Sequence, residues 1–188
     1  MVKAKLVDKT LVIKLLTQSF KDNQSVNYIV RHTKNRLKHI EALMDYSFEM
    51  CSIFGDVWIS DDRKACALVL YPDEKRTTLK AIILDLKVIL MAIGISGVRK
   101  AIDREARIKA KQPKLPMAYL WFIGVDPSAQ HKGTGTRLLQ EVIADSRKKK
   151  LPIFLETSTV SNIPWYEHNG FKVYEELNLT YTLYFLKN

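Results

Sequence analysis

Two glycines, Gly133 and Gly135, lie where a polar loop changes into a helical pattern. In the stretch 130–135 (QHKGTG) they follow Gln130 and lead directly into the apolar spacing of a helix. Successive backbone N–H groups in such a turn, together with the unpaired amides of a first helical turn, form a concave anion site. Because glycine has no Cβ, a bulky anion can come close to these amides. The spacing therefore predicts a backbone cradle suited to a pyrophosphate.

Two other phosphate-binding motifs fit this stretch less well. A Walker loop needs a lysine directly after its last glycine, whereas Lys132 precedes Gly133, so this motif is excluded. The dinucleotide-binding motif G-x-G-x-x-G would use Gly133, Gly135 and an acidic residue further along, where Glu156 lies. However, Leu138 stands in place of the third glycine, and a long loop separates the first glycine from the preceding strand. Both differences disfavour a dinucleotide site.

The hydrophobic pattern predicts the strands and helices that must position these residues. Helical spacing occurs over 10–20, 25–30, 35–55, 133–149 and 162–170, and strand-like runs occur over 3–7, 56–60, 65–71, 117–125, 152–157, 172–177 and 180–187. The alternation after residue 117 predicts an α/β (α+β mixed) sheet with at least one parallel crossover. We expect the continuous apolar run 117–125 to be buried on both faces.

A further helical segment over 77–110 precedes this run. Gly94 and Gly97 predict a break that makes two helices of it. Its apolar part is interrupted by charged residues, and its uncharged run 88–98 is about half as long as the ~20 residues that a membrane-spanning helix needs. We expect a buried or amphipathic helix and no membrane partner, with a membrane-surface role as the lesser alternative.

Composition and charge narrow the class further. The 188 residues, 47% hydrophobic and 27% charged, fit one globular domain with an insertion. The formal net charge of +10 predicts acidic partners, either nucleic acid or a polyphosphate. Nucleic acid is disfavoured, because the basic stretches 99–114 and 147–150 lack interleaved aromatic residues. Cys51 and Cys66 fit two buried thiols in a reducing cytoplasm.

Taken in order, residues 117–173 resemble the GCN5-related N-acetyltransferase (GNAT) family. The resemblance rests on the Q-x-x-G-x-G element at 130–135 and on a downstream N-x-x-x-Y-x-x-x-G-F element formed by Asn162, Tyr166, Gly170 and Phe171. It implies a mixed sheet with splayed parallel strands, flanked by helices, that binds acetyl-CoA as co-substrate and uses no metal.

The resemblance also implies roles for individual residues. The backbone after Trp121 would pair with pantetheine, the loop would hold the pyrophosphate, and Tyr166 would be the general acid that protonates the departing thiolate. Lys132 and Arg137 could add positive charge. The residues assigned to the cofactor are Ile123, Gly124, Val125, Gln130, His131, Lys132, Gly133, Thr134, Gly135, Thr136, Asn162 and Tyr166.

This chain departs from many members of the family in the run 117–125, which contains no acid that could act as base. Deprotonation of the acceptor would then fall to Glu156, Glu49, His39 or water, and the sequence leaves these alternatives open. The helical segment 77–110 is a second departure, which could reshape the acceptor site or form a homodimer surface. An acceptor pocket could be lined by Trp58, Tyr71, Trp121 and Trp165, although core packing is the alternative for most of them.

Together these features predict a single cytoplasmic acetyltransferase domain over 1–188, with its cofactor-binding core at about 117–173. It would move an acetyl group from acetyl-CoA to a small-molecule or peptide amine by direct transfer in a ternary complex. A CoA-binding module without catalysis is the first alternative, and a basic nucleic-acid-binding protein is the second.

Overall fold

The computed structural model describes residues 1–188 and contains a mixed, 7-stranded sheet in the order β1-β2-β3-β4-β5-β7-β6. Its strands are β1 (Val2–Lys3), β2 (Gly55–Ile59), β3 (Ala65–Leu70), β4 (Ala118–Val125), β5 (Ile153–Thr157), β6 (Lys172–Asn178) and β7 (Thr182–Lys187). Only β4 and β5 pair in parallel, and the other neighbours are antiparallel. The predicted mixed sheet and parallel crossover are confirmed.

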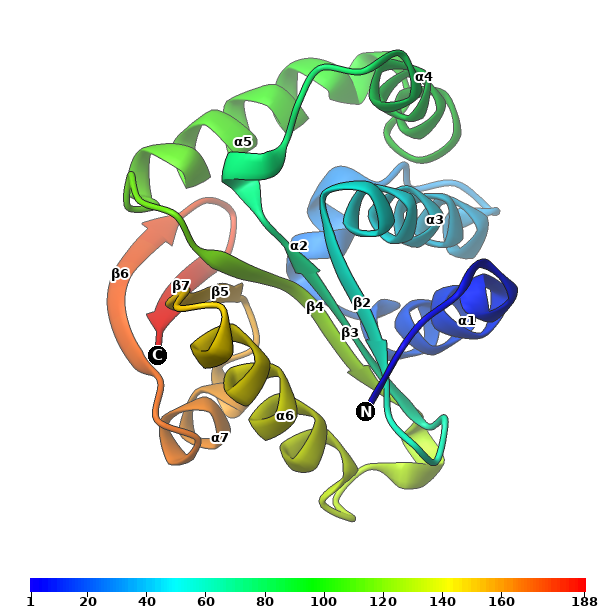
Figure 1. The fold of residues 1–188 in the computed structure, drawn as a ribbon. Helices are drawn as coiled ribbons and strands as arrows, with labels where there is room; N and C mark the ends of the chain where they lie inside the picture. Colours follow the sequence, from blue (N-terminus) through cyan, green and yellow to red (C-terminus); the bar gives the residue numbers. More distant parts are fainter.

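Helices cover both faces of this sheet (Figure 1). They are α1 (Lys9–Phe20), α2 (Gln24–Ile29), α3 (Arg36–Phe54), α4 (Leu79–Val88), α5 (Val98–Lys111), α6 (Thr134–Lys148) and α7 (Ile163–His168). Short 3-10 turns are η1 (Leu6–Asp8), η2 (Pro72–Glu74), η4 (Ile95–Gly97), η5 (Pro127–Ala129) and η6 (Val160–Asn162), and η3 (Ile89–Ile93) is a π-helical turn. In Figure 1, α1 to α3 lie on one face and α6 and α7 on the other, while α4 lies outside α3.

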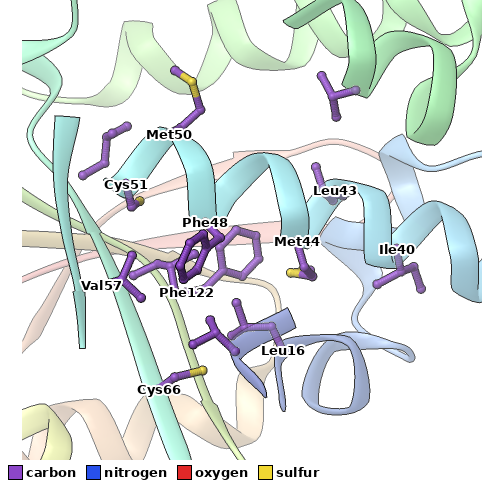
Figure 2. Packing of buried hydrophobic residues seen from close by; sticks show 14 of the residues in the cluster. Leu16, Ile40, Leu43, Met44, Phe48, Met50, Cys51, Val57, Cys66 and Phe122 are labelled. Atoms are coloured by element: carbon purple, nitrogen blue, oxygen red, sulfur yellow. The ribbon is translucent and has the colours of Figure 1, made fainter. Parts of the chain in front are cut away.

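The larger core joins α1 and α3 to the sheet. In Figure 2, Phe48 and Met44 of α3 point toward Phe122 of β4 and Leu16 of α1. Phe20 adds an edge-to-face contact with Phe122, with ring centroids 5.0 Å apart. Burial of these large side chains is the main favourable contribution to folding. It fixes β4, the strand that precedes the glycine loop, against two helices.

The second core lies on the opposite face and positions α6 and α7. Leu138 and Leu139 of α6 pack with Leu120 of β4, and Tyr166 and Phe171 join the same cluster. The predicted apolar stripe of this helix is therefore its buried face. Residues of β4 alternate between buried and half-buried, so one face of the strand is fully buried and the other is partly exposed.

The strand expected over 3–7 is present but shorter than predicted. Val2–Lys3 pairs with β2, the Ala4 N–H still donates to the carbonyl of Val57 at 2.8 Å, and Leu6–Asp8 forms the 3-10 turn η1. The turn forms because Asp8 Oδ2 accepts a hydrogen bond from the backbone N–H of Lys5 at 2.8 Å. A short polar side chain that captures nearby backbone amides competes with strand pairing.

The predicted break in the segment 77–110 is confirmed. Gly94 has φ +78°, a conformation that favours glycine, and a Cβ there would lie 2.5 Å from Cδ of Arg31. No single helix is long and apolar enough to cross a membrane, and only the bent pair Leu79–Ile93 and Ile95–Lys111, at 101°, passes that test together. Cys51 and Cys66 are free and buried, as predicted.

Candidate active site

The parallel strands β4 and β5 separate soon after they pair. Their register contains only Ala118 opposite Ile153 and Tyr119 opposite Phe154. Beyond these residues β4 continues to Val125 while paired only with β3, and β5 continues to Thr157 while paired with β7. The predicted splay is therefore present, and it leaves one edge of β4 free to pair with an extended ligand.

The loop after β4 is shaped by local hydrogen bonds that the sequence encodes. Asp126 Oδ1 accepts from the Ser128 backbone N–H at 2.8 Å and starts the 3-10 turn η5. Gln130 Nε2 reaches back to the carbonyl of Val125 at 3.4 Å, so this glutamine ties the loop to the strand. His131 and Gly133 both have positive φ, 59° and 80°, and α6 begins at the next residue.

The backbone of this loop offers a continuous run of free donors. The N–H groups of residues 130–136 make no hydrogen bond within the protein, and the first helical bond runs from Arg137 N–H to the carbonyl of Gly133. A Cβ at Gly133 would meet nothing within 4 Å, so space remains open beside these donors. Free amides at a helix start with open space beside them fit a diphosphate.

Two of the predicted cofactor glycines are explained by packing within the protein. A Cβ on Gly135 would lie 3.0 Å from Cγ2 of Val125, so this glycine lets α6 approach β4. A Cβ on Gly124 would lie 2.9 Å from Oγ of Ser19 in α1. Gly124 is thus a position of close approach and does not lie at a bulge, because the register shift of β4 against β3 falls between Leu68 and Val69.

Side chains of the loop and the start of α6 make few contacts. Lys132 Nζ donates to the carbonyl of Ser128 at 2.8 Å, and Arg137 is exposed. Thr134 Oγ1 lies 3.4 Å from Oδ2 of Asp62 in the β2–β3 turn. No sequence motif predicted this contact, because Asp62 is far away in the chain and lies outside every motif.

The helix α7 holds the second motif next to the loop. Trp165 Nε1 donates to Oγ1 of Thr136 at 2.9 Å, which joins α7 to the first turn of α6. Asn162 is exposed and lies immediately before α7, whereas Tyr166 is buried within it. The two motifs predicted from sequence are therefore brought together, and Trp165 is the residue that links them.

Tyr166 has the environment of a neutral proton donor. It is 6% exposed and packs against Trp165 and Phe171, with ring centroids 4.7 and 5.6 Å away. Its hydroxyl makes no hydrogen bond within the protein, yet it is not among the fully enclosed orphan atoms, which are Thr17 Oγ1, Arg31 Nε and Trp58 Nε1. Burial raises the pKa of Tyr166 well above its usual range, so the phenol keeps its proton.

Glu156 of β5 lies where the two strands have separated. The Tyr119 hydroxyl on β4 donates to its Oε2, and Gln112 Nε2, directly after α5, donates to its Oε1 at 2.8 Å. Burial raises the pKa of Glu156, and these two hydrogen bonds oppose the rise, so that the pKa is about 6. A carboxyl that titrates near neutral pH can accept a proton.

The other two candidate bases are engaged elsewhere. Glu49 binds Lys9 and Lys80 at 2.7 and 3.1 Å; these bonds outweigh the effect of burial and lower its pKa. His39 lies 2.7 Å from the carbonyl of Met91 and 2.9 Å from Oγ1 of Thr33, beside η3. Neither residue contacts the splayed strands.

The side of the sheet that carries Glu156 also holds an open groove. Arg104 of α5 donates to the hydroxyl of Tyr181 at 3.1 Å and to Oγ of Ser25 at 2.5 Å, which ties α5 to α2 and to the β6–β7 turn. Beside this contact lies a groove of about 390 Å³. It is lined by Gln24, Asn27, Tyr28, His32, Lys100, Thr180 and Tyr181.

The four aromatic residues considered for an acceptor pocket do not form one. Trp121 packs with Tyr46 in the α3 core. Tyr71 donates to Asp56 at 2.6 Å, and Lys149, just beyond the far end of α6, lies over the rings of Trp58 and Tyr71. No group of three or more His, Cys, Asp or Glu side chains is arranged to hold a metal ion.

The parallel strands β4 and β5 separate in front of the glycine-rich start of α6. This is the arrangement expected from the resemblance of the sequence to the GNAT acyltransferases. The family model described as an acetyltransferase (GNAT) domain matches residues 87–173. An uncharacterized N-acetyltransferase of Schizosaccharomyces pombe is 37% identical over 62 residues, which cover 33% of this chain and 25% of the relative. The matched part thus spans about a quarter of the relative's length.

Solved structures share the fold over almost the whole chain. An acetyltransferase from Corynebacterium glutamicum, described as histone acetyltransferase HPA2 and related acetyltransferase, has a TM-score of 0.73 at 18% identity and covers 98% of this chain and 93% of its own. Arylalkylamine N-acetyltransferase 2 from Aedes aegypti has a TM-score of 0.68 at 15% identity, and the match covers 100% of this chain and 96% of the Aedes chain. The C-terminal condensation domain of Ebony, in complex with beta-alanyl-dopamine, has a TM-score of 0.69 at 10% identity, and the match covers 100% of this chain and 96% of the Ebony domain. Residues 87–173 thus match a GNAT acetyltransferase domain, and these solved structures share the fold over almost the whole chain.

Proposed function

We propose that the protein transfers an acetyl group from acetyl-CoA to a primary amine while both are bound in a ternary complex. The observation that carries this proposal is the run of free backbone N–H groups at 130–136, which opens beside the gap between β4 and β5. The matched GNAT domain supports acetyl transfer. Two structural neighbours are described with arylalkylamine or beta-alanyl-dopamine in their names, which supports a small-molecule amine, while a third is described as a histone acetyltransferase, so a peptide amine stays an alternative.

Each group of predicted cofactor residues would bind a different part of CoA. The free edge of β4 at Ile123, Gly124 and Val125 would pair with pantetheine. The amides of residues 130–136 would hold the pyrophosphate, with Gly133 providing the turn and Lys132 nearby adding charge. Exposed Asn162 would contact the pantetheine arm from the start of α7.

Acetyl-CoA would supply a thioester carbonyl for the amine to attack. The Glu156 carboxylate would take a proton from the amine nitrogen, and the Tyr166 hydroxyl would give a proton to the departing sulfur. An N–C bond forms, a C–S bond breaks, and the proton count balances. The groove beside Arg104 lies on the Glu156 side of the sheet and is our candidate for the acceptor entrance.

Glu156 also argues against the alternative function, a CoA-binding module without catalysis. The best argument for a CoA-binding module without catalysis was the missing acid on β4, and the neighbouring strand supplies a carboxyl with a pKa of about 6. We further propose one acetyltransferase domain over 1–188 acting in the cytoplasm, a location that the two free cysteines support.

Calorimetry with the purified chain tests cofactor binding directly. CoA and acetyl-CoA should both bind, and Gly135→Trp should abolish binding, because Val125 and Trp165 leave no room at this position. A screen of small amines, amino acids and peptides, read by release of free CoA, then identifies the acceptor. Failure to bind CoA would overturn the proposal, and binding without transfer to any acceptor would favour the non-catalytic module. Retention of DNA or RNA that acetyl-CoA does not displace would favour the nucleic-acid alternative.

A further inference from the structure

Helix α4 is apolar on two opposite faces. Its inner face, with Ala81, Leu84 and Val88, packs into the α3 core. Its outer face, continued by η3, carries five exposed aliphatic side chains that we call the α4 stripe: Leu79 (74% exposed), Ile82 (44%), Ile83 (56%) and Leu86 (57%) on α4, and Leu90 (58%) on η3. Figure 1 shows α4 at the periphery of the molecule, outside α3, with no element covering it.

The spacing of the α4 stripe makes it one continuous surface. Residues three and four apart lie next to each other on a helix, and the members of the stripe follow this interval without a break. Single exposed aliphatic residues are common, whereas a contiguous patch marks an interaction surface. Burial in the protein does not explain these residues, because a different set on the same helix makes the core contacts.

Much of the excess positive charge of the chain lies on α5 and the residues after it, which follow the α4 stripe. Residues 99–114 contain seven Lys and Arg against two Asp and Glu, whereas residues 72–98 contain four against three. Arg99 and Lys100 follow the stripe, are exposed and make no ion pair, whereas exposed Lys75 and Arg76 before it are balanced by exposed Asp73 and Glu74. Lys80 and Lys87 on α4 itself pair with Glu49 and Asp45 of α3, at 3.1 and 2.7 Å.

This charge distribution decides which partner fits. A second copy packed stripe to stripe would offer the basic segment 99–114 no surface of opposite charge, because residues 72–98 have almost no net charge. The surface of an anionic bilayer offers negative headgroups for this basic segment and an acyl boundary for the aliphatic face. We propose that the α4 stripe docks the protein on an anionic lipid bilayer without crossing it. The inference is independent of the acetyl-transfer proposal.

The docked orientation leaves the glycine loop free. In Figure 1 the loop that precedes α6 lies at the opposite side of the molecule from α4. The sequence expectation of no membrane partner rested on the length of the apolar run, which concerns spanning. The outward direction of these side chains became apparent only in the folded protein.

Vesicle sedimentation tests the proposal. The full chain should sediment with phosphatidylcholine vesicles containing phosphatidylserine, and binding should weaken at high salt and with phosphatidylcholine alone. Ile83→Glu and Leu86→Glu should each weaken binding at least about tenfold, because a charge would enter the acyl boundary. Leu6→Glu is the matched control: it changes an aliphatic residue that is 75% exposed, outside the stripe, by the same charge, and it should bind as the unmodified protein does.

Circular dichroism of each variant separates loss of binding from loss of folding. The proposal is overturned if the unmodified protein does not sediment with anionic vesicles. It is equally overturned if Leu6→Glu weakens binding as much as the stripe variants, or if light scattering shows a dimer that Ile83→Glu dissociates.

Discussion

The Tyr119 hydroxyl on β4 donates a hydrogen bond to Glu156 on β5 across the point where the two strands separate. Gln112, at the end of the helical segment that precedes β4, donates to the other carboxyl oxygen. The residue that directly follows α5 thus reaches the candidate site, and both lie within the matched residues 87–173. It helps to enclose an acid whose pKa, about 6, suits proton transfer near neutral pH.

Replacement of Glu156 tests its role as proton acceptor. Glu156→Gln keeps the size of the side chain but cannot take a proton, so turnover should fall about 10²-fold while acetyl-CoA affinity is unchanged. In the unmodified enzyme kcat/KM should rise with pH through about 6, as the carboxyl ionises. The variant should lose this dependence. An identical pH profile in both proteins would remove Glu156 from the mechanism without affecting the proposed acetyl transfer.

Tyr119→Phe tests how the same carboxyl is tuned. The hydrogen bond from Tyr119 lowers the pKa of Glu156, so its removal should raise that pKa. The acidic limb of the pH–rate profile should therefore move to higher pH, with full activity recovered in alkaline buffer. Steady-state rates across the pH range measure the shift. A uniform loss of activity at every pH would instead indicate a purely structural role.

Tyr166→Phe removes the proposed proton donor and little else, because the hydroxyl makes no hydrogen bond within the protein. Turnover should fall about 10²-fold, and calorimetry should give unchanged affinity for acetyl-CoA. Tyr184→Phe is a suitable control, since this tyrosine packs on the same cluster and its hydroxyl also makes no hydrogen bond. Equal turnover of the two variants would show that Tyr166 only fills space.

Variants at Gly133 distinguish the effect of backbone conformation on CoA binding from the effect of space for the ligand. At φ +80° a β-branched residue is strained by about 1–2 kcal/mol, whereas asparagine tolerates this conformation. Gly133→Val should therefore weaken CoA binding about tenfold, and Gly133→Asn should stay closer to the unmodified protein, because a Cβ there meets no protein atom. If calorimetry gave the same affinity for both variants, the turn would not be what positions the cradle.

A buried ion pair beyond the far end of α6 predicts a pH effect on stability. Burial opposes ionisation of Asp56, but hydrogen bonds from Lys149, Lys3 and Tyr71 outweigh it and lower the pKa of Asp56 to about 2. Its contribution is therefore present above pH ~4, where an unfolded aspartate is ionised, and is lost as pH falls towards 2. Asp56→Asn should lower the free energy of unfolding by about 1–3 kcal/mol at pH 7. Thermal melts should show no change for exposed Asp73→Asn.

Most of the secondary structure follows from local pattern. The apolar spacing of α6, the run that became β4 and the glycines at the break before α5 each act over a few residues, so the sequence was sufficient to place them. The first strand was the exception, because two hydrogen bonds between Lys5 and Asp8 form a turn that ends strand pairing early. Such a competition between local contacts is not visible in hydrophobic periodicity.

By itself, the sequence predicted an anion-binding loop in which Gly133 and Gly135 leave the backbone accessible, and the motifs around Gln130 and Tyr166 indicated the resemblance to the GNAT family. Tertiary structure decided which contacts give these residues their properties. Gly124 and Gly135 proved to serve helix packing, Trp165 joined the two motifs, and Glu156 emerged among the candidate bases because Tyr119 and Gln112 surround it. Burial and long-range hydrogen bonds depend on residues distant in the chain, so only the folded protein can set them.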